Sequence, residues 1–354
     1  MQGKEQSRRA FLIGGIGATL VSVGAYAEDA LSESDTSATV GFLSVTAFGA
    51  KADGKTDDTA SINAAIEACG KRQLKHLRFP AGTYRLTSTL KLLSGITYQA
   101  DGPVILLMQE GDSPVMKTVG KMRGRTAIIG DFRLMGSRKP NNHGIVLSDY
   151  YSRIEGISVS NCGGHGILLS EVDSGDGSLV ENIIKDCRIT KAGLSAIRIG
   201  VRGNNKLTDG VLQNIIIRCD SDSPAVSIQS AAGWIIQNIH VYGKTSTAFS
   251  INNAYFTVLE NLYVESYKKS AIDVSNLQTS ISFLNVAIKA KESAAPVIKV
   301  AVDSAYANPT AAFSNVSVIY NGKAEITALD ISPSIVHNAA TLLVGGRSKT
   351  LVKV

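Results

Sequence analysis

The chain has 354 residues, of which 44% are apolar and 19% charged, enough for one large domain or two ordinary ones. These proportions exclude a disordered chain, collagen and a coiled coil. Lys and Arg outnumber Asp and Glu by 36 to 30, and the resulting net charge of +6 is too small to indicate a nucleic-acid partner. Four cysteines are too few for a disulfide framework.

Residues 1–27 have the pattern of an export signal. Arg8 and Arg9 precede a weakly hydrophobic run, Ile13 to Gly24, and small residues follow at Ala25 and Ala27. This resembles a twin-arginine signal, which implies the twin-arginine translocase and signal peptidase as partners. A membrane anchor is the alternative, but the run is shorter than the ~20 residues of a spanning helix, and no later segment could span a bilayer. We expect cleavage after Ala27, a linker over residues 28–44 and a periplasmic or secreted mature chain.

A short phrase recurs through the rest of the chain: two small residues, then an apolar residue, any residue and another apolar residue. Its copies begin 22 to 31 residues apart, at His143, His165, Ser195, Pro224, Thr247, Ser270, Pro296 and Thr327. A second phrase, usually Asn followed by apolar, any and apolar, alternates with it and begins at Gly156, Asn182, Asn214, Asn238, Asn261, Asn285 and Asn315. Strands this short and this far apart cannot be hairpins. The sequence therefore predicts an all-β fold, a parallel β-helix in which each turn stacks on the one before.

Three further features follow from this prediction. The asparagines should form a ladder at the corners, where Asn tolerates a left-handed backbone. Cys162, Cys187 and Cys219 should form an inward stack of free thiols. Helical spacing over Thr59 to Cys69, preceded by Asp57 and Asp58, predicts a helix that caps the N-terminal end of the core. We expect residues 45–102 to form the first segment, about 103–339 the coils, and 340–354 a C-terminal cap.

The segment from Val45 to Ala50, the acidic run from Asp53 to Thr59, and Phe79 to Tyr84 together resemble the start of the pectate-lyase-like superfamily. That superfamily includes rhamnogalacturonase- and epimerase-like proteins, family 28 glycosidases and phage tailspikes. The resemblance is specific over residues 45–102. It implies a right-handed, single-stranded parallel β-helix and a polysaccharide partner. The acids Asp53, Asp57 and Asp58 have turn and capping roles, so we interpret them as structural.

The match to family 28 glycosidases is incomplete. Gly164, His165 and Gly166 match their Gly-His-Gly, but the preceding coil has Asp149, Tyr150 and Tyr151 where an acidic pair would stand. His143 and Gly144 repeat the phrase one coil earlier, which also fits a purely structural role for these histidines. A family 28 hydrolase is therefore disfavoured.

The two longest neighbouring coils indicate a cleft. Their extra residues lie in Ser170 to Leu179 and Gly200 to Gly210, just after the same strand. Alignment of the phrase places one outward column beside them, at Val146, Leu168, Arg198, Ser227, Ser250, Asp273, Lys299 and Asp330. The candidate catalytic residues are Asp173, Asp176, Arg198 and His165. The candidate substrate-binding residues are Asp149, Tyr150, Tyr151, Glu171, Arg202 and Lys206.

These residue types fit two chemistries. Hydrolysis of a glycosidic bond needs two flanking carboxyl groups, which Asp173 with Asp176 or Asp149 would supply. Elimination from a uronate needs a base for the C5 proton and a cation for the carboxylate, which Arg198, Arg202 or Lys206 would supply, with Ca²⁺ in the case of a lyase. No other cofactor is indicated. We expect a polysaccharide lyase, hydrolase or epimerase; the alternatives are a non-catalytic carbohydrate-binding solenoid and, third, a tailspike-like homotrimer.

Overall fold

The computed structural model describes residues 41–120, 124–172, 178–201, 206–291, 294–302, 308–321, 325–338, 342–345 and 350–353. The predicted export signal, residues 28–40 of the predicted linker, and the candidate residues Asp173, Asp176 and Arg202 lie outside the described residues. The predicted C-terminal cap over 340–354 is described only at 342–345 and 350–353.

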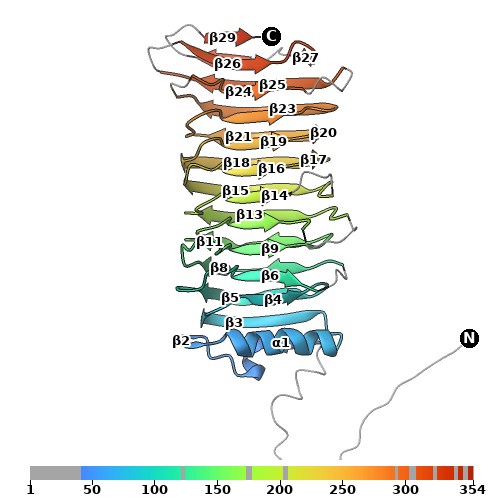
Figure 1. The fold of residues 1–354 in the computed structure, drawn as a ribbon, viewed down its shortest axis with the longest axis vertical. Coiled ribbons are helices and arrows are strands. Elements are labelled where there is room, and N and C mark those ends of the chain that lie inside the picture. The colour runs from blue at the N-terminus through green and yellow to red at the C-terminus, as the bar shows by residue number, and fades with distance from the viewer. Residues whose placement is uncertain are drawn as a thin grey trace, which may run out of the picture.

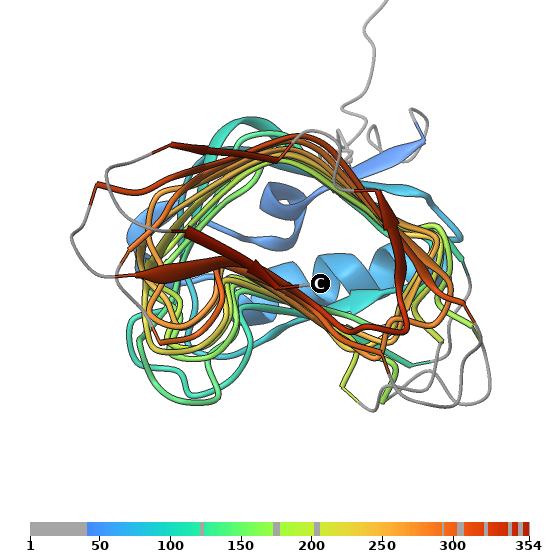
Figure 2. The same cartoon turned by 90° about the horizontal axis from the view of Figure 1, so that it is seen from above.

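The strands wind into a parallel solenoid, whose coils lie one above another (Figure 1) and superimpose when seen along the stack (Figure 2). We call the two large sheets sheet A and sheet B. Sheet B consists of β4 (Leu90–Leu93), β6 (Met116–Val119), β9 (Ile145–Leu147), β12 (Ile167–Leu169), β14 (Ile197–Ile199), β16 (Val226–Ile228), β19 (Phe249–Asn252), β22 (Ile272–Ser275), β24 (Ile298–Val300), β26 (Ile326–Ile331) and β29 (Thr350–Lys353).

Sheet A is longer and bends at a corner. It consists of β1 (Phe42–Ser44), β2 (Asp53–Asp57), β3 (His76–Arg85), β5 (Thr97–Leu107), β7 (Ala127–Ile129), β8 (Phe132–Met135), β10 (Arg153–Glu155), β11 (Ser158–Ser160), β13 (Ile183–Thr190), β15 (Val211–Asp220), β18 (Ile235–Lys244), β21 (Thr257–Val264), β23 (Ser280–Lys289), β25 (Thr310–Ile319), β27 (Val336–Asn338) and β28 (Leu342–Gly345). A small third sheet pairs β17 (Ala231–Ala232) with β20 (Ala254–Tyr255). The predicted parallel β-helix is confirmed.

The eight copies of the first phrase end in the sheet B strands from β9 to β26. Their inward residues align in one buried column, for example Ile167, Ile197, Val226 and Phe249. Parallel pairing without register shifts puts equal positions of successive coils about 4.8 Å apart, so apolar side chains stack into one continuous core. The predicted outward column from Val146 to Asp330 is also confirmed by the register.

The predicted asparagine ladder is present, with one correction. Asn214 and Asn238 have left-handed backbones, with φ near 55°, and the side-chain amide of Asn238 donates to Oδ1 of Asn214 over 2.9 Å. One coil earlier the corner residue is Asp186, whose carboxylate accepts from the Asn214 amide at 2.9 Å. Asn182, expected in the ladder, is instead buried four residues before the corner and accepts from the backbone N–H of Ser152.

The predicted stack of cysteines is wrong for the same reason. Cys187 lies opposite Ile215 and Cys219 opposite Gly243 in the next coil, so the thiols stand in different columns. All three are free; Cys162 and Cys187 are buried, and Cys219 is partly exposed.

The predicted helix is found as α1 (Thr59–Lys71), at the N-terminal end of the stack (Figure 1). Ile62, Ala65, Ile66 and Cys69 are buried in the hydrophobic core. A 3₁₀ helix, η2 (Val45–Phe48), precedes it. The role of α1 as a cap remains a prediction. At the other end, β28 pairs with β25 and β29 with β26, so the last described strands continue both sheets.

The acids of the first segment have structural roles, as expected. The carboxylate of Asp58 accepts from the backbone N–H groups of Lys51 and Ala52, and that of Asp53 accepts from Lys55 and Thr56. Among the described residues, no helix is both long and apolar enough to cross a bilayer.

Candidate active site

The candidate site lies on the outward face of sheet B, where the register places Lys117, Val146, Leu168, Arg198 and Ser227 in one column. Three strand spacings separate Lys117 from Arg198, a distance of about 14 Å. The two cations therefore lie at opposite ends of a short apolar stretch. Lys117 was not predicted, because β6 lacks the repeated phrase.

Two histidines stack at the edge of this face, just before β9 and β12. The rings of His143 and His165 are nearly parallel, with centroids 5.4 Å apart and planes 12° apart. The backbone N–H of His165 donates to Nδ1 of His143 over 2.8 Å, so the neutral form of His143 carries its proton on Nε2. Burial and the charge of Lys117 lower the pKa of His143.

His165 is held more firmly in its neutral form. Burial, followed by the charges of His143 and Arg198, lowers its pKa to about 4. Its Nδ1 is enclosed and has no hydrogen-bond partner among the described residues. A hydrogen bond between the ring and the Ser195 backbone acts in the opposite direction, but burial outweighs it. At neutral pH this imidazole is therefore uncharged and can accept a proton.

Arg198 points from β14 toward the next coil. Its Nε donates to the carbonyl of Gly200 at 2.8 Å, and its Nη1 donates to Oγ of Ser227 at 2.9 Å. Burial of the half-exposed guanidinium lowers its pKa, and the nearby charge of Glu171 acts in the opposite direction. Within the described residues its hydrogen-bond partners are neutral, so the charge of this partly buried guanidinium is available for an incoming carboxylate.

Glu171 connects the starts of the two long loops. Both of its carboxylate oxygens lie within 2.9 Å of the backbone nitrogen of Val201, which donates to them, and the side chain is 2% exposed. The carbonyl of Lys206 accepts from the backbone N–H of Leu179, which joins the loops again at their ends. Glu171 therefore holds the starts of the two loops together beside Arg198. Its side chain is not exposed for contact with a ligand.

The predicted binding residues Asp149, Tyr150 and Tyr151 are separated by the fold. Asp149 is 1% exposed and accepts from the Thr126 hydroxyl at 2.5 Å, and burial raises its pKa. The ring of Tyr150 packs over Gly124, and its edge meets Tyr151 at a centroid distance of 5.1 Å. Tyr151 alone of the three is well exposed, at 45%.

The structure thus brings His165, Arg198 and Glu171 together and adds His143 and Lys117 to them. The repetition of the His-Gly phrase was the signal that could have included His143. Asp173, Asp176 and Arg202 lie outside the described residues. Within the described ranges, no three His, Cys, Asp or Glu side chains are grouped to hold a metal ion.

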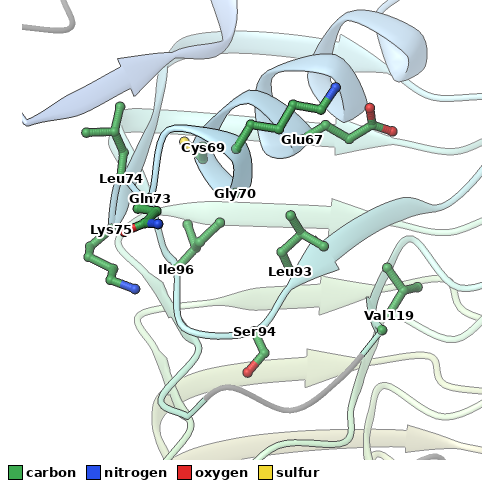
Figure 3. A pocket seen from close by; sticks show the side chains of 12 residues that line it. Glu67, Cys69, Gly70, Gln73, Leu74, Lys75, Leu93, Ser94, Ile96 and Val119 are labelled. Atoms are coloured by element: carbon green, nitrogen blue, oxygen red, sulfur yellow. The ribbon is translucent and has the colours of Figure 1, made fainter.

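A separate cavity of about 760 Å³ lies beside the C-terminal end of α1 (Figure 3). Its walls include Leu74, Leu93 and Ile96, with Glu67 and Lys75 also lining it. These walls mix polar and apolar side chains. We place the candidate reaction on sheet B, where two histidines and Arg198 are grouped.

Known proteins resemble this chain in fold. The A-module of the mannuronan C-5 epimerase AlgE4 of Azotobacter vinelandii aligns with 88% of this chain and 100% of its own, with a TM-score of 0.64 and 17% identity. PfbA, a surface adhesin of Streptococcus pneumoniae, aligns with 87% of this chain and 93% of its own, with a TM-score of 0.51 and 15% identity. At these identities the likeness shows the fold alone.

In sequence, a probable glucan endo-1,3-beta-glucosidase of Arthroderma benhamiae is 46% identical over 55 residues. That match spans 16% of this chain and 6% of the fungal protein. A family model matches a much larger part of this chain, residues 42–295. This model is described as rhamnogalacturonase A/epimerase, pectate lyase-like. The repeated coils, the first segment and this match agree, and the chain belongs to the rhamnogalacturonase A/epimerase, pectate lyase-like family.

Proposed function

We propose that this protein is an enzyme that acts on a uronate-containing polysaccharide and removes the C5 proton of a uronate residue on the outward face of sheet B. The observation that carries the proposal is the position of His165 in the turn before β12 and of Arg198 on the paired neighbouring strand β14, where the charge of Arg198 acts on the neutral imidazole. Membership of a family described by a polysaccharide-degrading enzyme and an epimerase supports the substrate class.

The chemistry follows from the charges. The C5 proton of a uronate lies next to a carboxylate, and its removal places further negative charge on that group. Arg198 would bind the carboxylate and stabilise this charge, because a preorganised cation in a partly dehydrated site acts strongly on developing charge. The neutral imidazole of His165 would accept the proton.

Two outcomes are open after proton removal. In elimination, the C5–H electrons form a C4–C5 double bond, the C4–O bond breaks, and the leaving oxygen takes up a proton. In epimerisation, a proton returns to C5 from the opposite face and no bond to the neighbouring sugar breaks. The described residues support the shared first step.

Hydrolysis fits the described residues less well. It requires two carboxyl groups that face the glycosidic bond. The carboxyl groups of Glu171 and Asp149, which lie in the described part of the site, are 2% and 1% exposed and are occupied by internal hydrogen bonds.

Replacement of Arg198 tests the proposal. We expect Arg198→Ala to lower kcat/KM on a uronate polymer by at least 100-fold, measured by 235 nm absorbance for elimination and by NMR for epimerisation. Arg188→Ala, an exposed arginine of β13 on sheet A, is the matched control and should keep wild-type turnover. Equal activity of the two variants would contradict the assignment.

A further inference from the structure

A second cavity, of about 400 Å³, lies on a different face, where the chain enters sheet A. It is lined by Arg125, Tyr151, Arg153, Glu181 and Ile183. These residues come from three successive coils, at the turns that precede β7, β10 and β13 and at the first residues of β10 and β13. Its volume is within the range of small-molecule sites, about 300–1,000 Å³.

Tyr151 lines this cavity with its backbone in a left-handed conformation that is unfavourable for tyrosine. Its φ is 54°, in the left-handed region that glycine and asparagine prefer, and its side chain is 45% exposed. Glu181, at the equivalent turn of the next coil, has a φ of 56° and is also exposed. The equivalent turns of the following coils, at Asp209, Gly233 and Phe256, are left-handed too, so this conformation belongs to the fold. It leaves the Tyr151 ring exposed at the cavity.

The two arginines differ in their partners. Nε of Arg153 donates to Oε2 of Glu155 at 2.6 Å, and Lys185 pairs with the same carboxylate at 3.0 Å, so Arg153 is fixed. The exposed Arg125 has neither an ion pair nor a side-chain hydrogen bond within the described residues. The guanidinium of Arg125 therefore makes no ion pair in the described part of the protein, although Glu181 lines the same cavity.

We propose that this cavity is an accessory binding site for a uronate residue of the polysaccharide. The Tyr151 ring would pack against the apolar C–H face of the sugar, Arg125 would bind the carboxylate, and Glu181 would accept hydrogen bonds from hydroxyl groups. The inference rests on the proposed function for its ligand class and places a second contact away from the sheet B site.

The test measures binding rather than turnover, in an Arg198→Ala background that removes the proposed carboxylate contact on sheet B. The probes are tetragalacturonate and tetramannuronate, with uncharged cellotetraose as the comparison, all followed by calorimetry. We expect at least one charged tetrasaccharide to bind at least tenfold more tightly than cellotetraose. Failure of both to bind, or equal binding of cellotetraose, would overturn the proposal.

Substitutions assign the binding to this cavity. Tyr151→Asn removes the ring and suits the left-handed backbone, so we expect the affinity to fall at least tenfold while the melting temperature stays level or rises. Arg125→Gln should also weaken binding tenfold, and Tyr151→Phe should retain it. Tyr263→Ala, an exposed tyrosine of β21, is the control. Unchanged affinity in Tyr151→Asn and Arg125→Gln would overturn the inference, even if the wild-type enzyme turns over the polymer. If these variants lose binding but the wild-type enzyme shows no turnover, only the proposed reaction is overturned.

Discussion

The imidazole of His165 is neutral over most of the pH range because its surroundings disfavour the charged form. Burial removes water from the ring, and the neighbouring His143 and Arg198 add unfavourable positive charge. The same guanidinium that would bind a substrate carboxylate therefore keeps the proposed base unprotonated. The position of Arg198 thus favours both the binding of the carboxylate and a neutral, proton-accepting His165.

This arrangement predicts a pH dependence of stability. The pKa of His165 is about 4 in the folded protein and about 6.5 in an unfolded chain, so the unfolded state binds more protons between these values. The free energy of unfolding should consequently fall as the pH drops from 6.5 to 4, by at most about 3 kcal/mol from this residue. Urea titrations at pH 4.5, 5.5 and 6.5 would measure it. His165→Gln should flatten this slope, and an unchanged slope would show that His165 does not cause it.

At the residue scale, the repeated phrase placed Arg198 in the outward column, which the register confirms, whereas His165 was singled out by the Gly-His-Gly resemblance. His143 was noted but interpreted as a strand opener, and Lys117 was missed. Asp149 and Glu171 were assigned to substrate, yet both are enclosed. A sequence does not show which carboxylates the backbone amides of a neighbouring coil will occupy.

At the scale of elements, the corner of sheet A depends on Asn214. Its left-handed backbone favours Asn or Gly, and its side chain bonds to Asp186 and Asn238. Asn214→Ala loses both features and should lower the free energy of unfolding by about 1–3 kcal/mol. Asn214→Gly keeps the backbone preference and should cost less, as urea denaturation can measure. A larger loss for glycine than for alanine would contradict this account of the corner.

The packing of α1 against the first coils gives a local prediction. Ile66 is fully buried, and Ile66→Ala should cost about 2–5 kcal/mol. Because each coil contacts mainly its neighbours, amide exchange should accelerate first in β3 and β5, if α1 acts as a cap. Emission from the single tryptophan, Trp234, which is buried far along the chain, provides the comparison. Wild-type exchange rates in β3 and β5 would argue against a capping role.

The corner column shows where prediction of the elements failed. Asn182 matches the second phrase, but Asp186 occupies the corner, because aspartate also tolerates a left-handed backbone and its carboxylate accepts the Asn214 amide. Counting from the wrong residue then misplaced Cys187. When two nearby positions both fit the second phrase, the sequence alone does not show which of them lies at the corner. The pairing of the neighbouring coils decides it.

At the scale of the molecule, the whole solenoid could be predicted, because its core is one column pattern repeated many times. A single misassigned corner does not alter which residues face inward in the other coils. The site is not repeated from coil to coil. It depends on single residues and on two long loops, and the sequence showed the length of these loops but not their contacts. This is why the fold was predicted better than the chemistry.

The proposed export signal can be tested in the full-length chain. If residues 1–27 direct export through the twin-arginine translocase, replacing Arg8 and Arg9 with lysine should retain the protein in the cytoplasm. Fractionation of cells that express the two forms would measure this. Equal recovery of both forms outside the cytoplasm would contradict a twin-arginine route.

The central claim is that the enzyme abstracts a C5 proton, and NMR in D₂O tests it most directly. Residues 28–354 would be incubated with polygalacturonate and with polymannuronate, and the C5–H signal followed beside reducing ends. We predict loss of the C5–H signal, with 235 nm absorbance in elimination or with deuterium at C5 in epimerisation, and neither change with Arg198→Ala. New reducing ends with the C5–H signal retained would mean hydrolysis and would contradict the account.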